Sequence, residues 1–203
     1  MNENKKLIEV YDKLFARFGK RYWWPADTPF EVVIGAVLTQ QTKWENVECA
    51  IRNLRERGLL EAGTLSMMDD EELEKLIRCT GFYRQKAKRL KNISLFFFEN
   101  PDILERQEDE LRALLLALNG IGDETADSSV LYAAGKPKFV IDAYTKRMCK
   151  CIGFEGDYRK LQSIFEGALP KDVTLYKEFH ALIVEYGKRF CGKKRCGECI
   201  IIS

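Results

Sequence analysis

Apolar side chains recur at intervals of three and four residues along most of the 203-residue chain, which is the spacing of amphipathic helices. Thr28 followed by Pro29 is typical of a helix start. The alternation typical of strands is scarce, and its best example, 138–141, is too short for a sheet. The pattern predicts an all-α protein with about ten helices, over residues 7–18, 29 onward, 44–54, 70–77, 85–97, 108–118, 124–134, 143–151, 158–168 and 175–190.

The composition fits a folded protein that does not enter membranes. Hydrophobic residues form 46% of the sequence and charged residues 32%, which argues against disorder. Apolar runs such as 32–38 are far shorter than the ~18 residues needed to cross a bilayer, and residues 1–6 do not lead into a signal-peptide core. Seven cysteines at uneven spacing indicate reduced thiols. We expect a protein of the cytoplasm.

Lysine and arginine gather in blocks although the net charge is only +2. The blocks lie at 84–91, 136–150 and 188–195. If they share one face, a near-neutral protein can still bind a polyanion. Solvated helix faces would give the same pattern, so the sequence leaves both interpretations open.

Two glycines separated by one apolar residue, Gly120-Ile121-Gly122, lie between two helical patterns. Glycine allows the sharp turn that a helical hairpin needs, and Ile121 can fill the core beneath it. Backbone N–H groups at the start of the next helix would then face outward and suit a phosphate. Many helical hairpins use glycine, so this motif alone also fits a purely structural turn.

About twenty residues later, Asp142 follows a short apolar run. By itself it would be an N-cap for the next helix. Together, the hairpin and this aspartate resemble the helix-hairpin-helix DNA glycosylase superfamily, which includes endonuclease III. The segments 29–42, 81–87 and 180–187 are similar to further motifs of that superfamily and occur in the same order.

The resemblance implies two helical lobes with the active site in the cleft between them. Residues 27–139 would form a six-helix barrel that contains the hairpin at about 114–130, and residues 1–26 with 140–203 would form the other lobe. The implied partner is double-stranded DNA with a damaged base, which the enzyme flips out of the stack. The resemblance also implies a monomer associated with the nucleoid. Asp142 would be catalytic, stabilising an oxocarbenium-like sugar. The implied DNA contacts are Gly120, Gly122, Thr125, Gln40 and Gln41. Of the two glutamines, Gln40 is the better match to the residue that the family inserts into the gap left by the flipped base.

Glu124 departs from the pattern of the superfamily's lyases. Its bifunctional members carry a lysine two residues after the final glycine of the hairpin, and that lysine forms a Schiff base with the sugar. Because a carboxylate cannot do so, we predict a monofunctional glycosylase without efficient lyase activity. Lys136 or Lys146 could replace the missing amine, and that alternative stays open.

Trp23-Trp24-Pro25 resembles the paired aromatics of the 3-methyladenine branch of the superfamily. Methylated purines carry positive charge, so an aromatic face can select them, and we assign Trp23, Trp24, Pro25 and Glu124 to the substrate pocket. The tryptophans could instead be core residues. Two other functions remain open: an endonuclease III-like enzyme for oxidised pyrimidines or mismatches, and a DNA-binding protein that has lost catalysis.

Cys191, Cys196 and Cys199 resemble the ligands of the family's 4Fe-4S cluster. The first gap holds four residues where endonuclease III has six, and a fourth cysteine would fall beyond Ser203. Four explanations fit this departure from the family's pattern: the chain is trimmed, the cluster is lost, the site has decayed, or the three thiolates and another ligand bind zinc. Lys193, Lys194 and Arg195 would serve a phosphate-binding loop in each case. We expect His180, the single histidine, to be structural.

Overall fold

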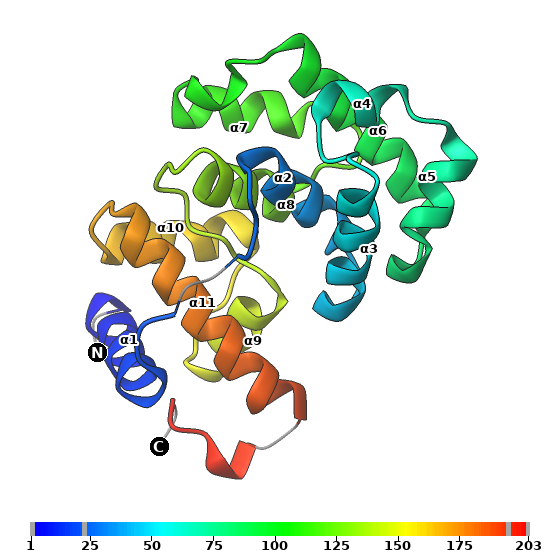
Figure 1. The fold of residues 1–203 in the computed structure, drawn as a ribbon. Helices are drawn as coiled ribbons and strands as arrows, with labels where there is room; N and C mark the ends of the chain where they lie inside the picture. Colours follow the sequence, from blue (N-terminus) through cyan, green and yellow to red (C-terminus); the bar gives the residue numbers. More distant parts are fainter. Residues whose placement is uncertain (1–2, 22–23, 194–195, 202–203) are drawn as a thin grey trace. The chain divides into compact units, whose positions relative to one another are not determined.

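A computed structural model describes residues 3–21, 24–193 and 196–201, with the side chains of residues 192 and 196 left out. The described residues form helices and no strand, which confirms the all-α prediction (Figure 1). No helix among them is long and apolar enough to span a membrane.

The α-helices are α1 (Glu3–Phe18), α2 (Pro29–Leu38), α3 (Trp44–Glu56), α4 (Ala62–Met67), α5 (Asp70–Leu76), α6 (Tyr83–Glu99), α7 (Glu108–Leu116), α8 (Asp123–Ser128), α9 (Ala143–Cys151), α10 (Tyr158–Ala168) and α11 (Val173–Arg189). Short helical turns are η1 (Arg78–Thr80), η2 (Ile103–Glu105), η3 (Ser129–Ala133), η4 (Cys191–Lys193) and η5 (Cys196–Glu198).

The chain divides into two compact units, one of residues 26–134 and the other of residues 1–25 with 135–203. The sequence analysis placed the boundary after residue 139, whereas the structure includes residues 135–139 in the second of these units. Packing explains the difference, because Phe139 stacks on Phe165 with ring centroids 4.2 Å apart. Gln162 Nε2 also donates to the Phe139 carbonyl at 2.7 Å.

The unit of residues 26–134 is built around α2, whose residues from Glu31 to Leu38 are all buried. Thr28 begins this helix as predicted, and its hydroxyl accepts a hydrogen bond from the Glu31 amide at 3.1 Å. The buried Glu31 carboxylate pairs with Arg55 of α3. A buried carboxylate needs such a partner, so this pair fixes α3 against the central helix.

The unit of residues 1–25 and 135–203 has an aromatic core. Phe139 packs against Tyr176 and Phe179 of α11 as well as Phe165 of α10. The predicted helix 175–190 is α11, which begins earlier, at Val173, because the Asp172 side chain caps it by accepting from the Leu175 amide at 2.6 Å. The core therefore holds the segment just before Asp142 in a fixed position.

Two elements differ from the predicted helices. The sequence analysis missed α4, because six residues are too few to show a helical period. The predicted helix 124–134 is α8 followed by the π-helical turn η3, in which the Ala134 amide donates to the Ser129 carbonyl at 3.0 Å. Such π turns are rare and often lie near functional sites.

Candidate functional site

The glycine hairpin joins α7 to α8 with Ile121 beneath it, 7% exposed, as predicted. Gly120 has φ +85°, in the region that favours glycine. A Cβ at this position would lie only 2.8 Å from Arg89 Cγ. Gly122 is exposed, has φ −99° and begins α8. Thus the backbone conformation favours glycine at the first position, where a Cβ would also displace the Arg89 side chain, and neither feature applies at the second.

Gln40 connects the end of α2 to the hairpin. Its Nε2 donates to the Gly120 carbonyl at 3.1 Å and to Thr125 Oγ1 at 3.0 Å, while Arg89 donates to its Oε1. The neighbouring Gln41 is exposed and has φ +54°. The structure therefore brings Gln40, Gly120 and Thr125 together as one bonded group, and leaves Gln41 as the glutamine that faces solvent.

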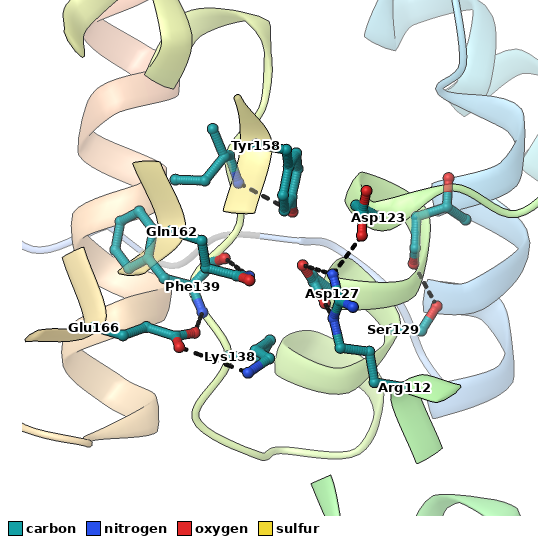
Figure 2. Close-up of polar contacts among 11 residues, drawn as sticks. Arg112, Asp123, Asp127, Ser129, Lys138, Phe139, Tyr158, Gln162 and Glu166 are labelled. Carbon is teal, nitrogen blue, oxygen red and sulfur yellow. Dashed lines mark hydrogen bonds and ion pairs between the residues drawn. The ribbon is translucent and has the colours of Figure 1, made fainter. Parts of the chain in front are cut away.

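Arg112 of α7 holds α8 through two carboxylates, an arrangement that the sequence analysis missed (Figure 2). Its Nε lies 2.6 Å from Asp127 Oδ1, and its Nη2 lies 2.6 Å from Asp123 Oδ1. Burial disfavours the charged guanidinium, but the two carboxylates outweigh it and raise the pKa of Arg112. The i, i+4 spacing of the aspartates was the available signal, because it places both on one helix face. Arg112 therefore links the two helices of the hairpin, α7 and α8, through ion pairs.

Glu124 is exposed in the first turn of α8, two residues after Gly122. Neither lysine offered as a substitute amine lies in α8. Lys136 follows η3 and is half-buried, and Lys146 of α9 places its Nζ 5.5 Å from the centre of the Tyr158 ring. Lys138, two residues after Lys136, forms an ion pair with Glu166, with its Nζ 3.6 Å from Glu166 Oε2 (Figure 2). The hairpin itself therefore carries a carboxylate where a lyase carries an amine.

Asp142 is the N-cap of α9, and its side chain is 15% exposed. Its Oδ1 accepts from the Thr145 amide at 2.7 Å. Its Oδ2 lies 3.8 Å from His180 Nε2 of α11. Burial lowers the pKa of His180, and the charge of Asp142 partly opposes that effect. The sequence analysis assigned this histidine a structural role and missed its proximity to Asp142.

An exposed aromatic residue, Phe82, stands directly before α6 and was also missed. It is 61% exposed and has φ +47°. The guanidinium groups of Arg78 and Arg84 lie 5.7 and 5.9 Å from the centre of the neighbouring Tyr83 ring. An exposed aromatic with cations nearby has the chemistry of a surface that stacks nucleic acid bases.

Only part of the predicted aromatic pocket can be described. Trp24 is half-buried with φ +73°, and Pro25 is exposed. Trp23 lies outside the described residues.

The cysteine loop is described for Cys191 and Cys199, both half-buried. The Tyr186 hydroxyl donates to Cys199 Sγ at 3.0 Å, and burial together with this contact raises the pKa of Tyr186. Among the described residues, no group of three or more metal-binding side chains converges. The side chain of Cys196, together with Lys194 and Arg195, lies outside them. The described thiols have the donor chemistry of a cluster site but do not form a complete ligand set.

The chain matches the HhH-GPD superfamily base excision DNA repair protein family over residues 34–171. It is 48% identical over 213 residues to a provisionally assigned DNA repair glycosylase of Methanocaldococcus jannaschii, covering 99% of this chain and 97% of that protein. It is 31% identical over 204 residues to endonuclease III of Thermotoga maritima, covering 96% and 90%. Among solved structures, it is similar to H. pylori 3-methyladenine DNA glycosylase bound to 1,N6-ethenoadenine, with a TM-score of 0.80 and 30% identity over 93% of this chain and 98% of that one.

The chain therefore belongs to the HhH-GPD superfamily of base excision DNA repair proteins and is a DNA glycosylase, an enzyme that hydrolyses N-glycosyl bonds. The resemblance inferred from the sequence is confirmed. Its relatives and structural neighbours include both endonuclease III and a 3-methyladenine glycosylase.

Proposed function

We propose that this protein is a monofunctional glycosylase that removes alkylated purines from duplex DNA and leaves the strand intact. The observation that carries the proposal is Glu124, exposed in the first turn of α8 immediately after the hairpin. A carboxylate there cannot form the Schiff base with the sugar that leads to strand cleavage.

The substrate class is supported by the aromatic segment and by similarity. Trp24 is held half-buried in a backbone conformation that tryptophan rarely adopts, and such conformations cluster at ligand sites. An aromatic face attracts the positive charge of a methylated purine. The 30% identity to a 3-methyladenine glycosylase agrees with this substrate. The similar identity to endonuclease III keeps oxidised pyrimidines as the second candidate.

The proposed reaction needs one carboxylate at the sugar and groups that bind the DNA backbone. The bond between the sugar and the base breaks, the electron pair leaves with the base, and water adds to the sugar. Asp142 stabilises the positive charge that develops on the sugar. The hairpin amides bind phosphate, Gln40 and Gln41 act beside the flipped base, and residues 193–195 contact the backbone.

We also propose that Cys191, Cys196, Cys199 and a further ligand would hold a 4Fe-4S cluster. When bound, such a cluster would stabilise the loop that carries Lys193. Iron and sulfide analysis of the purified protein tests it, and Cys199→Ser would lower the iron content.

The test is base release from methylated duplex DNA, with strand cleavage scored before and after hot alkali. We expect release of 3-methyladenine or a related purine, and cleavage only after alkali. Asp142→Asn should slow release by roughly 100-fold or more, since it removes the charge but keeps the cap. Release only of oxidised pyrimidines, or cleavage before alkali, would contradict the proposal.

Glu124→Lys is the matched gain-of-function control. It places an amine where lyases carry one, so borohydride should trap a covalent adduct with DNA that the parent protein does not form. A trapped adduct in the parent protein, lost in Lys136→Ala or Lys146→Ala, would instead identify a substitute amine.

A further inference from the structure

The two oxygens of Asp142 face different groups. Oδ1 is occupied by the Thr145 amide at 2.7 Å, as the cap of α9. Oδ2 faces His180 Nε2 at 3.8 Å. The cap fixes the rotamer of the carboxylate, so the histidine stands opposite the one oxygen that is not engaged by the helix.

His180 sits in an apolar setting that favours its neutral form. It is 4% exposed and meets the Phe139 ring edge-on, with centroids 6.5 Å apart. Burial penalises the charged imidazolium, and the carboxylate of Asp142 acts in the opposite direction. A neutral imidazole beside Asp142 leaves the charge of the carboxylate uncompensated, whereas a protonated one would pair with it.

Other titratable groups come from the elements that pack against α11. From α9 comes the thiol of Cys149, whose pKa burial raises to about 12, so it stays neutral. From α1 comes Tyr11, whose hydroxyl donates to Glu178 at 2.7 Å. From η4 come Cys191 and Lys193.

Within α11 itself, the titratable neighbours of His180 are Tyr176, Lys177 and Glu178. Asp142 is the charged group that acts on the histidine. His180 and Asp142 therefore form a local pair.

We infer that His180 controls the pH dependence of Asp142: while His180 is neutral, Asp142 Oδ2 can act on the sugar, whereas protonated His180 draws the carboxylate into an ion pair and switches base release off at acid pH. The inference rests on the proposed function of Asp142. It predicts that protonation of His180 beside the carboxylate contributes to the acid limb of the rate profile.

The first test observes the pair without using activity. Because the chain has one histidine, its imidazole signals in an NMR titration are assigned without ambiguity. We expect His180 to titrate about one pH unit lower in Asp142→Asn than in the parent protein, since the opposite charge is gone. Identical titration curves in the two proteins would overturn the inference.

The second test measures single-turnover base release from pH 4.5 to 8.5 for the parent protein and His180→Gln. Near pH 8 the two rates should agree within about threefold, whereas the acid limb of the variant should move to lower pH, since the imidazolium that would hold the carboxylate is absent. Coincident acid limbs in a folded variant would overturn the inference.

His180→Asn serves as the second variant if glutamine disturbs the core, and circular dichroism checks that each variant is folded. Failure of the proposed function is distinguishable. Full activity of Asp142→Asn would overturn the role of the carboxylate, and with it the role of the pair in catalysis, even where the NMR coupling persists.

Discussion

Three non-glycine residues, Trp24, Gln41 and Phe82, have positive φ in the described chain. Non-glycine residues in this region cost free energy of order 1 kcal/mol or more, and they persist where the surrounding structure enforces them. The sequence assigned the first two to the substrate pocket and the DNA contacts, and the third stands exposed beside basic residues. Backbone strain thus concentrates on residues with a proposed role in binding.

The two hairpin glycines should respond differently to alanine. Gly120→Ala combines a positive φ with a collision against Arg89, the partner of Gln40, so we expect a loss of about 1–3 kcal/mol in the free energy of unfolding. Gly122→Ala meets nothing within 4 Å at an ordinary φ and should change it by less than about 0.5 kcal/mol. Urea unfolding checks both values, and equal losses would contradict the argument.

At the scale of elements, α2 is fixed at both ends by side chains. Thr28 caps its first turn. At the other end, Lys86 of α6 donates to the Leu38 carbonyl at 2.9 Å and to the Thr80 carbonyl at 2.8 Å. Since Leu38 is followed directly by the turn that carries Gln40, this buried amine fixes the connection between α2 and the hairpin.

Lys86 should give stability an unusual pH dependence. Burial, with the nearby charge of Arg89, lowers the pKa of Lys86 from 10.5 to about 8. Between these values the unfolded chain binds more protons than the folded one, so the contribution of this group to stability rises with pH and is lowest below 8. In urea unfolding from pH 7 to 10.5, the stability of the parent protein relative to Lys86→Met should increase. Parallel curves would contradict the assignment.

The sequence predicted most of the helices but only some of the contacts at the candidate site, and this difference between helices and contacts has a physical cause. Amphipathic period and capping residues such as Thr28 are local signals, so most helices were found. The six-residue α4 and the π turn after α8 carry no such signal. The approach of His180 to Asp142 depends on how two helices separated along the chain pack, which the spacing of residues in the sequence does not encode.

At the scale of the whole molecule, part of the positive charge of the basic block at 84–91 is engaged within the protein. In the block at 84–91, Arg84 pairs with Glu74, Lys91 with Asp70, and Lys86 is buried. Elsewhere in the described chain, arginines at 55, 57, 106, 112 and 189 also form ion pairs. These pairs reduce the number of cations that can contact phosphates without first leaving a carboxylate, and the net charge of the protein is only +2.

We therefore expect a shallow dependence of DNA affinity on salt. Each phosphate neutralised contributes about −0.9 to the slope of log K against log salt concentration, so contact with roughly four phosphates gives a slope near −4. Lys193→Ala, in the exposed cysteine loop, should make the slope shallower by about 1. Lys5→Ala, whose lysine faces Glu9 on α1, is the matched control and should leave it unchanged. Fluorescence anisotropy with abasic duplex DNA measures the slopes, with the salt concentration varied from about 50 to about 300 mM. A slope of about −8 or steeper would show that the paired arginines exchange their carboxylates for phosphates. The basic blocks would then act together, which is one of the two interpretations that the sequence left open.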